Sequence, residues 1–286
     1  MEKIISFQIA KSKREFVRYQ EDRGPYFYDK LHQHPQCQLT VILEGSGQFL
    51  SGDYVGRFQG GDVFFLGENA PHVFRSDGIY FEGKANLSVA GNTVFFDFEA
   101  IKNGLLNLDE LHALNRFRDF AGLCFQVQGT TAQQIQEVLQ SFKIREGLQR
   151  FQAALALLNL LEQAGEELQQ LNSGGRLLGL SEKDGSRMDR VMQYVLAHRF
   201  QKITLAEVAE EANLTKEAFC RFFKLRTRKT FTDYLLHLRI NEAQKLLQET
   251  DLSISEIAYR VGFENLSYFN RSFKRISGKT PRYFRA

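Results

Sequence analysis

The spacing of hydrophobic and polar residues changes once within the first 172 residues of the chain. Up to about residue 98, short β-rich runs alternate with turns that contain Gly, Asp or Asn. The clearest of these runs are QLTVILEG, GQFLSG, DVFFLG, HVFRS and TVFFDFE. Short strands that follow each other so closely favour an antiparallel sandwich or barrel.

From Asp109 onward the hydrophobic residues recur with a helical period and form three apolar stripes. The stripes comprise Leu111, Leu114, Phe117 and Phe120, then Ile135, Val138, Leu139 and Phe142, and finally the stretch from Leu148 to Leu171. The last stretch has two possible partners, a second copy of the chain or the chain's own β-rich domain. We favour the second copy and expect a homodimer through Phe151, Leu155, Leu158 and Leu161.

Residues 173–186, SGGRLLGLSEKDGS, are rich in Gly, Ser and charged side chains, which is typical of a linker. The linker separates an N-terminal domain of residues 1–172 from a C-terminal domain of residues 187–286. The predicted fold class is therefore α+β with two domains. The N-terminal domain is expected to be a β-barrel followed by helices, and the C-terminal domain is expected to be all-α.

Residues 203–284 contain the same pattern twice, 49 to 50 positions apart. The matching pairs are Glu207/Glu256, Ala209/Ala258, Phe219/Phe269, Arg221/Arg271, Phe223/Phe273, Lys224/Lys274, Lys229/Lys279 and Thr230/Thr280. Each copy consists of a short apolar helix, a tight turn and a basic amphipathic helix. This is the helix-turn-helix, whose second helix enters the major groove of DNA.

The turns and helix faces agree with this motif. We expect Asn213 in the first turn to adopt the left-handed conformation that Gly262 adopts in the second, and Thr215 to cap the second helix. The inward side chains are predicted to be Phe219, Phe222 and Phe223 in the first copy and Tyr268, Phe269 and Phe273 in the second.

Charge is divided unequally between the two domains. Residues 187–286 carry 19 Lys and Arg against 11 Asp and Glu, although the whole chain has a net charge of only +3. Clustered positive charge is what phosphate binding requires. The charge therefore supports DNA as the partner of the C-terminal domain.

The stretch ISEIAYRVGFENLSYFNRSFKRISGKTPRYFR resembles the signature of AraC/XylS-type transcriptional regulators, and the resemblance covers residues 187–286. It implies a long central helix, here about Thr232 to Gln248, which joins the two helix-turn-helix motifs. It also implies DNA contacts from one face of each second helix, with Lys224 and Lys274 at the rims. The residues at these positions are Glu217, Cys220, Arg221, Lys224, Asn265, Leu266, Ser267, Asn270, Arg271 and Lys274.

A second resemblance covers roughly residues 5–100. LHQHPQCQLTVILEGSG and GGDVFFLGENAPHVF are similar to the two motifs of cupin barrels, and such a barrel is the usual ligand-sensing domain of AraC/XylS-type regulators. We therefore expect an effector pocket inside the barrel, formed by His32, His34, Gln38, Phe64 and His72.

The pocket histidines permit two interpretations. Three imidazoles can hold a divalent transition metal, and Gln38 stands where metal-binding cupins usually carry Glu. The alternative is that His32, His34 and His72 bond to each other, to backbone carbonyls or to a polar effector. No cofactor follows with certainty from the sequence.

The expected function is ligand-responsive, sequence-specific transcription regulation, with activation as the expected mode. The partners would be double-stranded promoter DNA, a small-molecule effector, RNA polymerase and a second copy of the chain. No apolar run approaches the length of a membrane span, so we expect a cytoplasmic protein. The alternative function is a cupin metalloenzyme with a regulatory DNA-binding domain, but no catalytic motif supports it.

Overall fold

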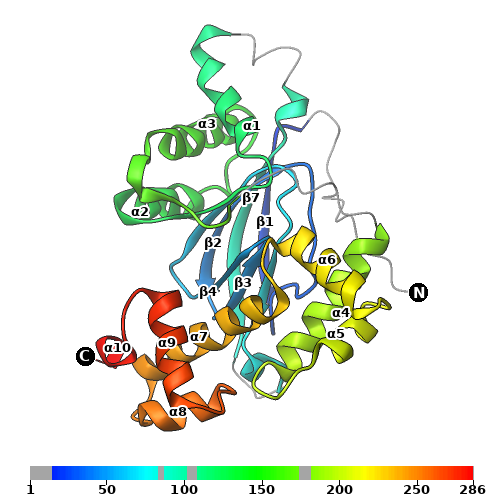
Figure 1. Ribbon diagram of the computed structural model, residues 1–286. Coiled ribbons are helices and arrows are strands. Elements are labelled where there is room, and N and C mark those ends of the chain that lie inside the picture. Colours follow the sequence, from blue (N-terminus) through cyan, green and yellow to red (C-terminus); the bar gives the residue numbers. More distant parts are fainter. Residues whose placement is uncertain (1–14, 83–86, 102–107, 174–181, 286) are drawn as a thin grey trace. The chain divides into compact units, whose positions relative to one another are not determined.

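The computed structural model describes residues 15–82, 87–101, 108–173 and 182–285. These residues form two compact units, a β-rich unit of described residues 15–173 and a helical unit of described residues 182–285. Figure 1 shows the β-rich unit in blue to green and the helical unit in yellow-green to red. The α+β fold class with two domains is thus confirmed. No described helix is long and apolar enough to cross a membrane.

The β-rich unit contains two antiparallel sheets. Within the described residues, the larger sheet has six strands in the order β1-β7-β2-β5-β8-β9, and the smaller has three in the order β4-β3-β6. The strands are β1 (Val17–Gly24), β2 (Cys37–Glu44), β3 (Gly47–Ser51), β4 (Tyr54–Phe58), β5 (Val63–Leu66), β6 (Val73–Ser76), β7 (Val89–Phe96), β8 (Cys124–Val127) and β9 (Leu168–Gln170).

The larger sheet is buried on both of its faces. Because side chains alternate along a strand, Val63 and Phe65 of β5 pack in one apolar core, whereas Phe64 and Leu66 pack in another. The first core includes residues of α2 and α3, and the second includes residues of β3, β4 and β6 from the smaller sheet. The larger sheet therefore lies between a helical layer and the smaller sheet.

The helical layer contains α2 (Gly129–Gln140) and α3 (Gly147–Gln163), preceded by the short α1 (Arg116–Asp119). The prediction that the apolar stripe on α3 packs against a second copy of the chain is wrong. Leu158 and Leu161 are fully buried in the chain's own core, and Phe151 and Leu155 are partly buried against it. The apolar stretch that was expected to run as a helix from Leu148 to Leu171 also ends earlier. The chain turns at Gly165, and residues 168–170 form strand β9.

The helical unit is built from seven helices within its described residues. They are α4 (Glu182–His198), α5 (Leu205–Glu211), α6 (Lys216–Thr227), α7 (Phe231–Glu249), α8 (Ile254–Arg260), α9 (Leu266–Ser277) and α10 (Pro281–Arg285). Helix α7 is the expected long central helix. Helix α4 begins at Glu182, so the end of the predicted linker is helical, and linker residues 174–181 lie outside the described residues.

Matching hydrogen bonds begin and end the helices of the two repeats. Helices α5 and α8 start with capping boxes, in which the Thr204 and Ser253 side chains pair with Glu207 and Glu256. Thr215 caps α6 as predicted. At the other end, the hydroxyls of Thr227 and Ser277 donate to the carbonyls of Phe223 and Phe273. The shared Glu residues of the repeat thus fix helix starts.

The turns of the two motifs have the expected left-handed backbone. Asn213 has φ 51° and Gly262 has φ 86°. A Cβ atom on Gly262 would lie 2.7 Å from the carbonyl oxygen of Phe200, so this turn tolerates no side chain. Ala209 and Ala258 are buried, as close approach of the paired helices requires. The two motifs therefore share their turn geometry, although only the second has glycine.

Gly262 and Gly278 provide a matched test of this turn. Both have positive φ, but a Cβ on Gly278 would meet nothing within 4 Å. Gly278→Ala should therefore cost only about 1 kcal/mol of left-handed strain, and Gly262→Ala should cost at least about 1 kcal/mol more because of the backbone clash. Urea unfolding followed by circular dichroism measures both values. Equal losses in the two variants would show that the Phe200 contact does not constrain the turn.

Candidate nucleic-acid interface and ligand cavity

Helices α6 and α9 are the second helices of the two motifs, and each exposes a polar face. Their buried faces carry the phenylalanine pairs of the repeat, Phe219 and Phe223 on α6 and Phe269 and Phe273 on α9. The predicted contact residues that are exposed are Glu217, Cys220, Arg221, Lys224, Asn265, Ser267, Asn270, Arg271 and Lys274. Both helices thus present an arginine and a lysine at equivalent exposed positions.

Three side chains on these helices differ from the sequence interpretation. Leu266 is only partly exposed, since it packs against the apolar core of the second motif. Tyr268 was expected to face inward but is 42% exposed. Phe222 is half-buried rather than part of the core. The exposed face of α9 therefore includes Tyr268, and Leu266 is less exposed on it than predicted.

Asn265 and Glu217 also serve the starts of their helices. The Asn265 side chain accepts a hydrogen bond from the backbone amide of Tyr268 at 2.9 Å, so its oxygen caps α9 and its NH₂ group remains for other contacts. Hydrogen bonds from its own backbone amide and from the Thr215 hydroxyl lower the pKa of the Glu217 carboxyl. Glu217 is therefore ionised and positioned at the positive end of α6.

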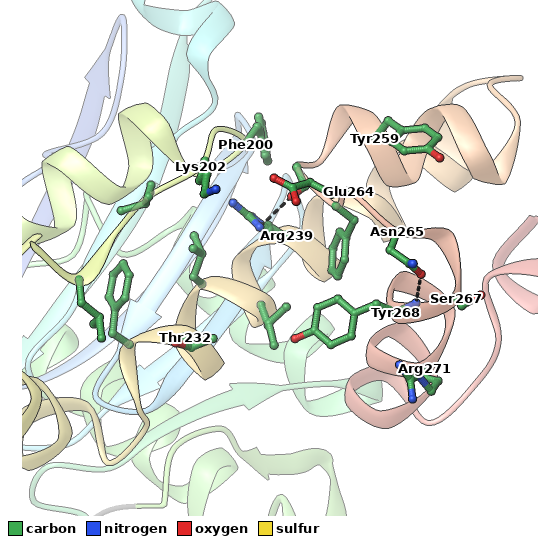
Figure 2. Close-up of a pocket in the computed structure, with 17 residues that line it drawn as sticks. Phe200, Lys202, Thr232, Arg239, Tyr259, Glu264, Asn265, Ser267, Tyr268 and Arg271 are labelled. Atoms are coloured by element: carbon green, nitrogen blue, oxygen red, sulfur yellow. Dashed lines mark hydrogen bonds between the residues drawn. The ribbon is translucent and has the colours of Figure 1, made fainter. Parts of the chain in front are cut away.

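A cleft of about 830 Å³ opens within the helical unit beside α9 (Figure 2). Its walls come from the segment after α4, from α7 and from the second motif. The lining residues include the cations Lys202, Arg239 and Arg271 and the aromatic residues Phe200, Phe231, Tyr259, Phe263 and Tyr268. Because Asn265, Ser267 and Arg271 also line it, the cleft continues the exposed face of α9.

Arg239 on α7 ties the walls of this cleft together, and the sequence analysis did not identify it. Its guanidinium donates to the backbone carbonyls of Arg199 at 2.7 Å, Gly262 at 2.8 Å and Gln201 at 2.7 Å. The first and third carbonyls follow α4, and the second belongs to the turn between α8 and α9. A charged residue within the apolar positions of a long helix was the signal available in the sequence.

The second candidate site is a small cavity of about 70 Å³ in the β-rich unit. Strands β1, β2, β6 and β7 and the segment before β2 form its walls. The lining residues are Gln20, Asp22, Phe27, Tyr28, His32, His34, Gln38, Thr40, Ile42, His72, Phe74, Thr93 and Phe95. The structure thus brings His32, His34, Gln38 and His72 together as predicted.

Phe64 does not line this cavity, contrary to the prediction. Its side chain is fully buried and packs on Phe49 and Phe74, with ring centroids 4.8 and 5.5 Å apart. The sequence analysis instead missed the polar residues Gln20, Asp22, Thr40 and Thr93. Their period-2 placement on neighbouring strands was the signal that could have found them.

Backbone pairing sets the three histidines side by side. His32 and His72 form an antiparallel bridge, and their rings lie 4.3 Å apart between centroids, with the His34 ring 5.3 Å from that of His72. One ligand nitrogen from each ring lies within 4.8 Å of the other two. Such a cluster is the kind of donor set that transition metals use.

Each imidazole is held by a backbone carbonyl at its Nδ1 atom. The partners are the oxygens of Lys30 for His32, Gln36 for His34 and Ala70 for His72, at 2.8, 2.9 and 2.8 Å. A carbonyl only accepts, so Nδ1 carries the proton where a neutral ring bonds to it. In His72, Nε2 is then a buried acceptor, and it has no hydrogen-bond partner among the described residues.

A chain of hydrogen bonds leads from His34 across the sheet. Gln38 lies 2.9 Å from His34 Nε2 through its Oε1 atom and donates to the Thr40 hydroxyl at 2.7 Å. The hydroxyls of Thr40 and Thr93 are 3.0 Å apart, and Thr93 donates to Asp22 at 3.3 Å. The polar groups of β2, β7 and β1 thus form one connected network with the histidines.

Burial governs the ionisation of the cavity. Loss of solvent lowers the pKa of His32 to about 4, and it also lowers the pKa of His34 and of His72. The same loss of solvent raises the pKa of the Asp22 carboxyl. The histidines are therefore neutral near pH 7, which is the state in which imidazole donates a lone pair.

The two sites together define a class of protein. Paired helix-turn-helix motifs with basic exposed helices are a DNA-binding arrangement, and a β-rich unit with a polar cavity is a ligand-binding arrangement. Two family profiles match these units, "AraC-like ligand binding domain" over residues 16–180 and "Helix-turn-helix domain" over residues 208–286. The chain belongs to the AraC family of transcription regulators.

Individual relatives agree with this assignment. The chain is 27% identical over 262 residues to the HTH-type transcriptional activator RhaR of Enterobacter sp. (strain 638), covering 91% of this chain and 88% of RhaR. It is 34% identical over 95 residues to the HTH-type transcriptional regulator YdeC of Bacillus subtilis (strain 168), covering 33% of each protein. These findings favour the regulator over the metalloenzyme alternative.

The chain is also similar to part of a protein whose structure has been solved. The C-terminal domain of the two-component response regulator yesN from Fusobacterium nucleatum is 32% identical, with a TM-score of 0.32. The match covers 34% of this chain and 94% of that domain.

The buried histidines predict how stability depends on pH. Their pKa values are lowered in the folded state, so between about pH 7.5 and 5.5 the unfolded chain takes up protons that the folded chain does not. The free energy of unfolding should therefore fall as the pH falls. His72→Leu should make this slope shallower by up to about 1.4 kcal/mol per pH unit, the value for one proton.

Urea unfolding of the full chain at several pH values measures the slope. The exposed residue His112 provides the control, because His112→Leu should leave the slope nearly as it is. An unchanged slope in His72→Leu would mean that this ring is protonated to the same extent in the folded and unfolded chains.

Proposed function

We propose that the protein reads a specific promoter sequence through α6 and α9 and that a ligand in the cavity of the β-rich unit controls this binding. The observation that carries the proposal is the equivalent exposure of Arg221 and Arg271 on two motifs with the same caps and turns. Two such helices suit successive major grooves of one duplex.

The exposed side chains have different roles in this proposal. Arg221 and Arg271 donate two hydrogen bonds to guanine, and Asn270 pairs with adenine. Lys224 and Lys274 contact phosphates, so they add affinity without sequence preference. Ser267 and Cys220 are short side chains that contact base edges in the major groove. Glu217 accepts a hydrogen bond from the amino group of cytosine. Asn265 contributes only its NH₂ group, since its oxygen caps α9.

The β-rich unit supplies the response to the effector. Its cavity contains a buried polar network, and leaving such groups without partners costs free energy. A ligand that completes the network changes the packing of the strands around it. The expected mode is activation, with RNA polymerase as a further partner and the cytoplasm as the place where promoter DNA is met.

Base reading can be tested at the two equivalent arginines. Arg221→Ala and Arg271→Ala should each weaken binding to the specific duplex by about 1 to 3 kcal/mol and relax preference at one base step. Lys224→Ala should weaken specific and random duplexes alike. Fluorescence anisotropy at fixed salt, with an operator obtained by in vitro selection, measures both effects. If each arginine variant lost the same affinity for both duplexes, the reading role would be refuted.

We also propose that the protein acts as a homodimer, now through a different surface from the predicted stripe. Ile144 is 83% exposed and Leu148 is 71% exposed, beside the start of α3. A contiguous patch of exposed apolar side chains marks a surface that a partner covers.

The dimer can be tested by sedimentation of the full chain at micromolar concentration. We expect a dimer for the parent and a monomer for the double variant Ile144→Ser, Leu148→Ser. Leu225 is 59% exposed in the helical unit, and Leu225→Ser should leave the dimer unchanged. A monomeric parent would disprove the homodimer, and a dimeric double variant would disprove this surface.

A further inference from the structure

We infer that His32, His34 and His72 form a binding site for a divalent transition-metal ion and that this ion is the ligand to which the regulator responds. The second half of the inference rests on the proposed function, whereas the first half rests on the cavity alone. The three rings offer one nitrogen each within 4.8 Å of one another. Three separate features of the cavity support the binding of a metal ion.

The first feature is the unpartnered nitrogen of His72. The side chain is 1% exposed, and its Nδ1 atom bonds to the carbonyl of Ala70. Its Nε2 atom is therefore a lone-pair donor in the interior of the unit, where the described residues offer it no hydrogen. An unsatisfied buried polar atom costs about 1 to 3 kcal/mol. A metal ion is a partner that needs no hydrogen.

The second feature is a mismatch at His34. Its two ring nitrogens each face a carbonyl oxygen, Gln36 O and Gln38 Oε1, both at 2.9 Å. A neutral imidazole has one N–H group and can satisfy only one of these acceptors. If Nδ1 serves Gln36, then in this orientation of the Gln38 amide His34 Nε2 and Gln38 Oε1 are two electron-pair donors that face each other. A cation bound between them would use both.

The third feature is the size of the cavity. Its volume is about 70 Å³, whereas one water takes about 30 Å³ of the liquid. The space is large enough for an ion with small ligands. Imidazole nitrogens hold a metal at about 2.0–2.1 Å, so the three nitrogens, which lie within 4.8 Å of one another, move closer together when they bind one ion.

The donor set also selects the kind of ion. Neutral imidazoles bind Zn²⁺, Ni²⁺, Cu²⁺ and Fe²⁺, whereas Mg²⁺ and Ca²⁺ require mostly oxygen ligands. The Nδ1 bonds to backbone carbonyls hold the rings in position, as outer partners do in known metal sites. Gln38 supplies a fourth, uncharged ligand through Oε1. Asp22 lines the same cavity and can balance part of the added charge.

Metal binding can be measured without DNA. Untagged full-length protein, stripped with a chelator and titrated with Co²⁺, should develop visible d–d absorption at one ion per chain. His34→Ala and His72→Ala should weaken Co²⁺ binding at least about 100-fold, because loss of a direct ligand exceeds the 10- to 100-fold loss typical of outer partners. The exposed His112 gives the control His112→Ala, which should bind like the parent.

A variant that should bind the metal more tightly is also needed, because a loss of binding could result from misfolding and a gain could not. Gln38→Glu places a carboxylate at the fourth position and should tighten Co²⁺ binding by about tenfold, because opposite charges attract in a buried site. The metal site would be overturned by a parent that binds no Co²⁺. It would also be overturned if His34→Ala and His72→Ala kept the parent affinity.

The regulatory half of the inference needs a second measurement. Operator affinity of the full chain should change at least fivefold between the stripped and the Zn²⁺- or Ni²⁺-loaded protein, and this change should vanish in His72→Ala. Metal sensing would be refuted if the protein bound Co²⁺ tightly but had the same operator affinity with and without each metal. Loss of specific operator binding in both states would instead refute the proposed function, so the two failures are distinguishable.

Discussion

Burial of the six-stranded sheet on both faces determines where polar chemistry can lie in the β-rich unit. One face packs against α2 and α3 in an apolar core, and the polar residues of β2 and β7 that line the cavity point to the other face. Gln38, Thr40 and Thr93 are there, each at most 7% exposed. Groups buried to this degree need partners, and they find most of them in each other. The histidines complete the network, and His72 Nε2 is left without a hydrogen-bond partner among the described residues.

The helical unit depends on a different kind of constraint, the ends of its helices. The capping boxes of α5 and α8 and the left-handed residues of both turns make the two motifs alike in spite of their different sequences. Arg239 then bonds the segment after α4 to the turn of the second motif. A side chain on the central helix thereby joins the segment that leads into the first motif to the turn of the second motif.

Features set by neighbouring residues could be predicted from the sequence. Helix periods, the cap at Thr215 and the turn at Asn213 depend on local chemistry, so the helical unit and its exposed arginines were predicted with few errors. The convergence of His32, His34 and His72 was implied by the resemblance to the two cupin motifs. The linker bounds stay a prediction, and α4 begins at Glu182 because polar residues before Arg187 can also start a helix.

Features set by distant packing could not be predicted. Leu158 and Leu161 are apolar whether α3 covers its own sheet or a second chain, and periodicity does not distinguish these cases. Phe64 lies in a strand that is apolar on both faces, so its side of the sheet was ambiguous. Strand β9 has only three residues, and Arg239 reveals its role only when three separate carbonyls come together.

Strand β1 is in contact with both the cavity and the helical layer of its unit. Gln20 and Asp22 face the cavity, whereas Tyr19 stacks on Phe142 and Glu21 pairs with Lys143 at 2.8 Å. Because the strand has a period of two, a slip of one residue against β7 would exchange these two sets of side chains. The register of β1 against β7 therefore keeps Gln20 and Asp22 in the cavity and keeps the contacts of Tyr19 and Glu21 in the helical layer.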